Sequence, residues 1–194
     1  IERGQYELPQ EQRLDLLEVI ARSAVERLLT SSLPAPTELA RTFGPVVAAG
    51  GMMAWSPLPA EEALFTGIGM DGSFESRAHG APVVVVADNA GANKIDAYAT
   101  RTLTVDGDTV TIDLANAAPG SGLPAYVIGN KVNRPDGTNY ARYTLYTERE
   151  VASLQVDGAD LPASRSNEFG RFAYTFYLAI DPASSRRLTV RLVP

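Results

Sequence analysis

The spacing of hydrophobic and polar positions changes once along the chain, and this change separates two kinds of predicted element. From residue 9 to 29 apolar residues recur at helical spacing with charged residues on the other side, which predicts an amphipathic helix lying on a core. From residue 81 onward the pattern becomes β-branched runs and period-two alternation bounded by turn residues. The chain therefore predicts helices first and strands second.

Prolines set the expected limits of the first two helices. Pro34 and Pro36 should end the first helix near residues 31–32, because proline disfavours helical geometry in the residue before it. Thr37 is then the expected N-cap of a second, shorter helix. Pro45 and the glycines that follow it should limit the length of that second helix.

The next stretch predicts a short buried strand and then a third helix. Residues 52–56 are apolar enough for the strand, and Trp55 within it is expected in the core. The prolines that follow, together with Glu61 and Glu62, suit a helix start, because proline tolerates the first turn and carboxylates favour the positive end of the helix dipole. This helix should end at the glycines after it.

Seven strands are predicted in the remainder of the chain. They lie near residues 82–88, 101–106, 109–115, 140–147, 151–156, 171–180 and 187–193. Asp-Gly pairs at 106–107, 136–137 and 157–158 mark turns, since both residues accept positive φ.

This order predicts an α+β fold, with N-terminal helices at 1–80 followed by an antiparallel β-sandwich-like domain at 81–194. A mixed sheet that shares one core with the helices is the alternative.

Composition excludes several classes of protein. The formal net charge is −6 and the basic residues are scattered, so no basic stripe exists to follow a phosphate backbone and nucleic-acid binding is not expected. The absence of cysteine excludes disulfides, thiolate metal sites and a cysteine nucleophile. The longest apolar run, 81–87, is too short to span a membrane. Because the chain begins at Ile1, we expect an anchor or further domain upstream.

The densest group of polar residues follows the first predicted strand. Asn89, Asn93, Lys94 and Asp96 come through a turn of small residues, and a loop on a rigid scaffold can aim such groups at a ligand. These four residues are the candidate ligand-binding site. The alternative, which we favour, is that the asparagines satisfy backbone groups in the turn while Lys94 and Asp96 pair or lie in solvent.

No catalytic residue, metal or cofactor is predicted. His79 is the only histidine, and no Gly-x-Ser-x-Gly segment accompanies it to supply a nucleophile. One histidine without cysteine does not make a credible transition-metal site. The close carboxylate pairs, which need not face each other in the fold, are Glu61/Glu62, Asp106/Asp108 and Asp157/Asp160.

Aromatic residues raise the possibility of carbohydrate binding. Tyr140 and Tyr146 should share one face of a strand, with Tyr143 on the other, because side chains alternate across a sheet. Phe172, Tyr174, Phe176 and Leu178 alternate with Ala173, Thr175, Tyr177 and Ala179, and this row is expected to face the core. Sugar binding would require a flat, exposed aromatic surface, and we favour a core location for nearly all of these aromatic residues.

Two segments resemble a known family. The segment NAGANKIDAY at 89–98 is similar to N-x-x-G-N-K-[IL]-D-x-[YF], and LANAAPGSGLPAYV at 114–127 is similar to T-N-x-A-P-x-x-G-L-P-x-Y-V, with Ala115 in place of threonine. Both patterns resemble the C-terminal part of the bacterial envelope proteins called domain of unknown function 4012. Residues 53–64 and 156–158 fit the same order of segments.

The resemblance implies a compartment and partners. Members of that family look like membrane-anchored proteins exposed outside the membrane, so we expect an extracytoplasmic, envelope-associated fragment. Its expected partners are the upstream part of the same protein and an envelope glycan or other envelope proteins, with the membrane reached only through the upstream anchor.

Three functions follow as hypotheses. The first is a non-enzymatic module of structural or interaction type. The second is part of an enzyme or carrier that acts on envelope glycans or lipid-linked glycan precursors, using the four residues above. The third is a carbohydrate-binding module that uses Tyr140, Tyr143 or Tyr146.

Overall fold

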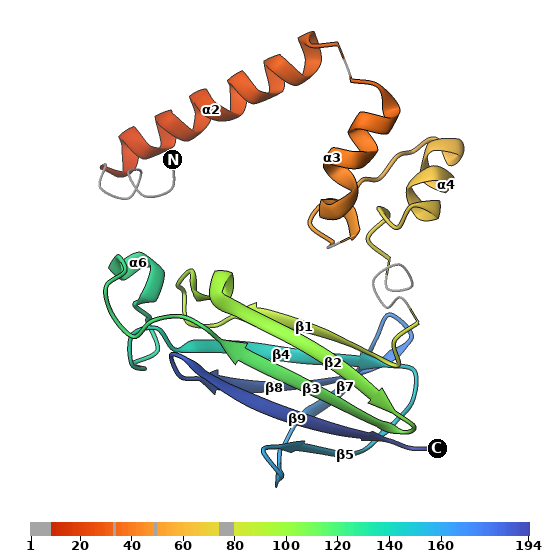
Figure 1. Ribbon diagram of the computed structural model, residues 1–194, viewed down its shortest axis with the longest axis vertical. Coiled ribbons are helices and arrows are strands. Elements are labelled where there is room, and N and C mark those ends of the chain that lie inside the picture. The colour runs from red at the N-terminus through yellow and green to blue at the C-terminus, as the bar shows by residue number, and fades with distance from the viewer. Residues whose placement is uncertain (1–8, 33, 49, 74–79) are drawn as a thin grey trace. The chain divides into compact units, whose positions relative to one another are not determined.

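The computed structural model describes residues 9–32, 34–48, 50–73 and 80–194. The chain divides into two compact units, residues 1–72 and 73–194. The first unit is helical and the second is built from two antiparallel sheets, which makes an α+β fold, as the change of periodicity predicts (Figure 1).

The helical unit contains α2 (Gln10–Thr30), α3 (Pro36–Ala48) and α4 (Pro59–Gly67). The first and third helices lie where the sequence predicts them. The second differs at its start: Pro36 is its first residue, because the missing N–H of proline is not needed there, so Thr37 lies inside the helix and is not the N-cap. Pro45 also lies within this helix and does not end it.

The predicted burial in the helical unit is wrong. Leu14, Leu17 and Val25 of α2 are 54%, 42% and 54% exposed, so this helix does not lie on a core formed by its own unit. Residues 52–56 form no strand, and Trp55 is 74% exposed. A backbone bond from Ala54 N to Met70 O, 2.9 Å long, holds this segment beside the end of α4 instead.

The second unit is a sandwich of two antiparallel sheets (Figure 1). The four-stranded sheet has the order β1 (Val83–Asn89), β4 (Asn139–Thr147), β8 (Arg171–Ile180) and β7 (Ser164–Glu168). The five-stranded sheet has the order β2 (Ala99–Asp106), β3 (Thr109–Asn116), β9 (Ser184–Leu192), β5 (Val151–Val156) and β6 (Ala159–Asp160). β1 and β2 therefore each lie at an edge of their sheets.

The core fills the space between the two sheets. Ile112, Leu145 and Leu188 are fully buried, and burying such a side chain stabilises the fold by about 1.5–3 kcal/mol. Phe172, Tyr174, Phe176 and Leu178 pack in or against this core, as predicted, whereas Tyr177 on the other side of the strand is exposed. Tyr143 faces the core as well, and the strand register places Tyr140 and Tyr146 on the opposite face of β4.

All seven strands predicted after residue 81 are present, and the sequence does not predict two further strands, β6 and β7. β7 has the sequence SRSNE and is exposed throughout, so it lacks the β-branched alternation that marks a strand. The turn residues differ slightly from expectation at the first hairpin. Asp106 pairs with Thr109, which leaves Gly107-Asp108 as the turn, with Gly107 at φ 56°.

Candidate functional site

The predicted polar residues lie at one end of the sandwich, between the first strands of the two sheets. Asn89 is the last residue of β1, and Asp96 lies in the short 3₁₀ helix η1 (Ile95–Tyr98), which leads directly into β2. The buried Ile95 anchors η1 in a small apolar cluster of its own. The chain thus crosses from one sheet to the other within this segment.

Three of the four predicted residues contact one another. Asn89 Nδ2 donates hydrogen bonds to Asp96 Oδ2 at 2.7 Å and to Asn93 Oδ1 at 2.9 Å. Asn89 Oδ1 accepts a bond from Gly91 N at 2.9 Å, so the amide also closes the turn that follows β1. The Lys94 side chain is exposed, while its backbone N–H donates to Val127 O at 3.1 Å.

Asn139 completes this group, and sequence reasoning missed it. Its Nδ2 donates to Asp96 Oδ1 at 3.2 Å, and the residue is only 2% exposed at the start of β4. We call Asn89, Asn93, Asp96 and Asn139 the Asn–Asp cluster. Asn139 lies 43 residues beyond Asp96 in the sequence, so only the strand pairing could have placed the two together.

A polar pocket of about 110 Å³ lies beside the cluster. Asp96, Asn139, Tyr143 and Arg101 contribute its polar side chains, together with Thr100. Asn139 Oδ1 is buried and has no hydrogen-bond partner among the residues that the structure describes. Burial raises the pKa of Tyr143, so its phenol is neutral at physiological pH.

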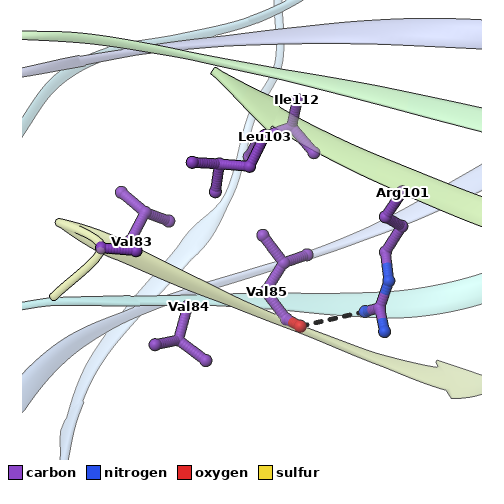
Figure 2. A pocket seen from close by; sticks show the side chains of 7 residues that line it. Val83, Val84, Val85, Arg101, Leu103 and Ile112 are labelled. Atoms are coloured by element: carbon purple, nitrogen blue, oxygen red, sulfur yellow. Dashed lines mark hydrogen bonds between the residues drawn. The ribbon is translucent and has the colours of Figure 1, made fainter. Parts of the chain in front are cut away.

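Arg101 also lines a second, apolar pocket of about 260 Å³. Figure 2 shows the second pocket, where Arg101 Nη1 donates to Val85 O at 2.9 Å. Its walls are mainly aliphatic, with Val83 and Val85 from β1 and Leu103 from β2. The two pockets line the space between the edge strands β1 and β2, and the arginine spans that space from one sheet to the other.

A scan against protein-family models, a search of curated proteins and a search of solved structures each found no match. The resemblance to the envelope family stays a prediction that depends on the two quoted segments.

The geometry of the cluster favours hydrogen bonding over acid–base chemistry. Both oxygens of Asp96 accept bonds from amides, one from Asn89 and one from Asn139. A carboxylate whose two oxygens accept hydrogen bonds from amides holds those amide side chains in place. A general base needs instead an oxygen within hydrogen-bond distance of a substrate proton. Within the described residues, no three His, Cys, Asp or Glu side chains form a group that could hold a metal ion.

The other candidate groups have structural partners or lie outside the described residues. Glu61 and Glu62 lie in the first turn of α4, as predicted, and both accept bonds from Ser56. In the remaining carboxylate pairs, Asp108 is paired with Arg149, Asp157 with Arg186, and Asp160 with Gln155. His79 lies outside the described residues. No helix in the described ranges is long and apolar enough to cross a membrane.

The second family-like segment contributes a buried asparagine that the sequence did not single out. Asn116 ends β3 and is 1% exposed. Its Nδ2 donates to Gly137 O, Ile180 O and Asp181 O at 2.8, 3.0 and 3.2 Å, and its Oδ1 accepts from Ala118 N at 3.1 Å. The residue holds three loops together at this end of the sandwich.

Proposed function

We propose that the chain is an extracytoplasmic, envelope-associated module of structural or interaction type, whose helical unit contacts the upstream part of the same protein. The observation that carries the interaction role is the exposure of apolar side chains on the helices. The large exposed apolar residues of this unit are Leu14, Leu16, Leu17, Val19, Val25, Leu29, Phe43, Val46, Met53, Trp55, Leu58, Leu64 and Ile68. The envelope compartment is proposed from the family resemblance.

The helical unit leaves most of its apolar side chains uncovered. Of the described residues in 9–72, only Ser56 is buried, so the helices do not cover one another's apolar faces. Leu14, Leu17 and Val25 lie on one side of α2 at helical spacing. Contiguous exposed apolar surface on a soluble protein marks an interaction site, because covering it contributes about 25 cal/mol per Å². A further polypeptide that packs on α2 would cover these exposed apolar side chains.

The Asn–Asp cluster supports a non-enzymatic role for the β-unit. Its amides and carboxylate bond to one another and tie η1 to β1 and β4. The second candidate function, part of an enzyme or carrier acting on envelope glycans or their lipid-linked precursors, has one observation in its favour. That observation is the buried Asn139 Oδ1, which has no hydrogen-bond partner among the described residues and belongs to a side chain that lines the polar pocket with Arg101.

Site-specific photocross-linking in the intact parent protein tests the proposal. A photoreactive phenylalanine analogue replaces Leu17 in one version and Asp15 in the control, because these positions lie on opposite sides of α2. We expect position 17 to cross-link to peptides upstream of residue 1 and position 15 to give a much lower yield. Equal yields from both positions, or cross-links confined to this chain's own residues, would contradict the proposed contact.

A further inference from the structure

The outer face of the four-stranded sheet carries aromatic side chains at two places. The register of β4 puts Tyr140, Arg142, Thr144 and Tyr146 on the side away from the core. Across from them on β8, Tyr177 lies on the same side and is 55% exposed. Tyr140 and Tyr146 therefore share one face of β4, as their spacing in the sequence predicts.

Each of the two tyrosines has an exposed aromatic neighbour. Tyr140 stacks with Tyr177, with ring centroids 5.7 Å apart and planes inclined by 23°. Tyr146 packs against Phe169, with ring centroids 6.3 Å apart, and Phe169 is 76% exposed. The guanidinium of Arg134 lies 5.2 Å from the centroid of the Tyr140 ring. We call the surface that carries these two pairs the tyrosine face.

A polar strip separates the two aromatic pairs. Tyr140 and Tyr146 are six residues apart on one strand, which places them about 20 Å apart at the usual rise of a β-strand. Between them, Arg142 pairs with Asp88 of β1 at 2.7 Å. The hydroxyls of Thr144 and Thr175 lie 3.1 Å apart in the same strip.

The charges on this surface are balanced. Arg134 and Arg142 are matched by Asp88 and by Glu168, which accepts a bond from the Tyr146 hydroxyl at 2.8 Å. The two carboxylates on this face disfavour a nucleic acid as the partner, because binding a phosphate backbone needs an excess of positive charge. The polar strip equally disfavours a purely apolar partner, because its charged groups would lose water without gaining partners.

We propose that the tyrosine face binds a linear, neutral oligosaccharide. The apolar face of one sugar ring packs on Tyr177 and that of another on Phe169, since tyrosine and phenylalanine rings offer rigid apolar area. Hydroxyl groups of the sugars between them bond to Arg142 and Asp88, whose charged atoms make stronger hydrogen bonds than neutral groups do. This inference does not depend on the contact proposed for the helical unit, which lies on other residues.

Saturation-transfer NMR and calorimetry with the full chain test the proposal. The probes are the neutral hexasaccharides of glucose and of N-acetylglucosamine, both β-1,4-linked, and the corresponding disaccharides. We expect at least one hexasaccharide to bind, and its disaccharide to bind at least about tenfold more weakly, because a disaccharide reaches only one aromatic pair.

Three variants locate the binding surface. Tyr177→Ala should weaken hexasaccharide binding by about tenfold or more, since exposed aromatic anchors dominate such contacts. Tyr177→Phe keeps the ring and should stay within about threefold of the unaltered chain, a difference smaller than the loss of one stacked ring. Trp55→Ala is the matched control, because Trp55 is an exposed aromatic residue of the helical unit.

Several outcomes would overturn the proposal. They are the absence of saturation transfer from both hexasaccharides at millimolar concentration, wild-type affinity in Tyr177→Ala, or an equal loss in Trp55→Ala. Tighter binding of a polyanion such as heparin would overturn the neutral ligand class. Near-ultraviolet circular dichroism checks folding, because every tyrosine except Tyr6 lies in residues 73–194.

Discussion

Replacement of Asn116 by alanine tests whether one buried amide holds the end of the sandwich together. The side chain makes hydrogen bonds to Gly137 O, Ile180 O, Asp181 O and Ala118 N from a position that is 1% exposed. Alanine keeps the β-strand backbone and removes the whole amide. Four backbone groups on three different loops then lose a partner at once.

The expected cost can be worked from these bonds. The amide has two N–H hydrogens, so the two shorter donated bonds and the accepted bond count as three full hydrogen bonds. At about 1 kcal/mol each, their loss lowers the free energy of unfolding by about 3 kcal/mol. That is a large share of the roughly 5–15 kcal/mol that stabilises an ordinary domain. With a slope of about 2 kcal/mol per molar urea, the midpoint falls by about 1.5 M.

Urea unfolding followed by the tyrosine signal in near-ultraviolet circular dichroism measures this change in the β-unit. Asn130→Ala is the matched control. The Asn130 amide also bridges backbone groups, with exposed bonds to Arg134 O at 2.7 Å and from Arg134 N at 2.9 Å and a part-buried bond from Val132 N at 3.1 Å. Water can replace the two exposed bonds, so we expect a loss of about 1 kcal/mol.

The reasoning is refuted if the two variants lose the same stability within about 0.5 kcal/mol, the usual error of such differences. An unchanged midpoint in Asn116→Ala would also refute it. The free energy of unfolding could also change its dependence on urea concentration while the midpoint stays the same. That result would mean that the substitution acts on the compactness of the native or the unfolded state and not on these hydrogen bonds.

Three further substitutions test turns and loops of the sandwich. Gly137→Ala should destabilise the β-unit by more than Gly107→Ala, measured as urea midpoints. A Cβ at 137 would lie 2.5 Å from Pro119 O at φ 81°, whereas at 107 only the positive φ of 56° is unfavourable. Arg186 and the backbone N–H of Arg187 hold the pKa of Asp157 below its ordinary value of 3.8. The ionised carboxylate therefore stabilises the fold above about pH 4, and this stabilisation is lost as the pH falls through the lowered pKa. Asp157→Asn, which tolerates the positive φ at this position, should therefore cost a little stability at pH 7 and make the acid-induced loss less steep.

The strands could be predicted from the sequence because their signal is local. Alternation from Thr109 to Ile112 marks β3 whatever lies beside it, and the row from Phe172 to Leu178 shows which side of β8 is buried. Strand order is not local in this sense. Nothing in the sequence of β9 indicates that it lies between β3 and β5.

Burial in the helical unit could not be predicted by the same reasoning. Helical spacing of Leu14, Leu17 and Val25 shows that the three residues share a face, and it contains no information on what covers that face. The type of Trp55 and its apolar neighbours in the sequence predict that it lies in the core. Its 74% exposure shows that apolar neighbours in sequence do not supply packing partners in space.

The candidate site shows where local reasoning stops being sufficient. Asparagines after a strand predict turn bonding, and Asn89 does close the turn through Gly91 N. The same amide also bonds to Asp96, and Asp96 in turn accepts a bond from Asn139 at the start of the neighbouring strand. η1, which precedes an edge strand of one sheet, is thereby fixed to two strands of the other. The cluster therefore limits how far the two sheets can separate at this end, while the buried Asn139 Oδ1 keeps no hydrogen-bond partner among the described residues.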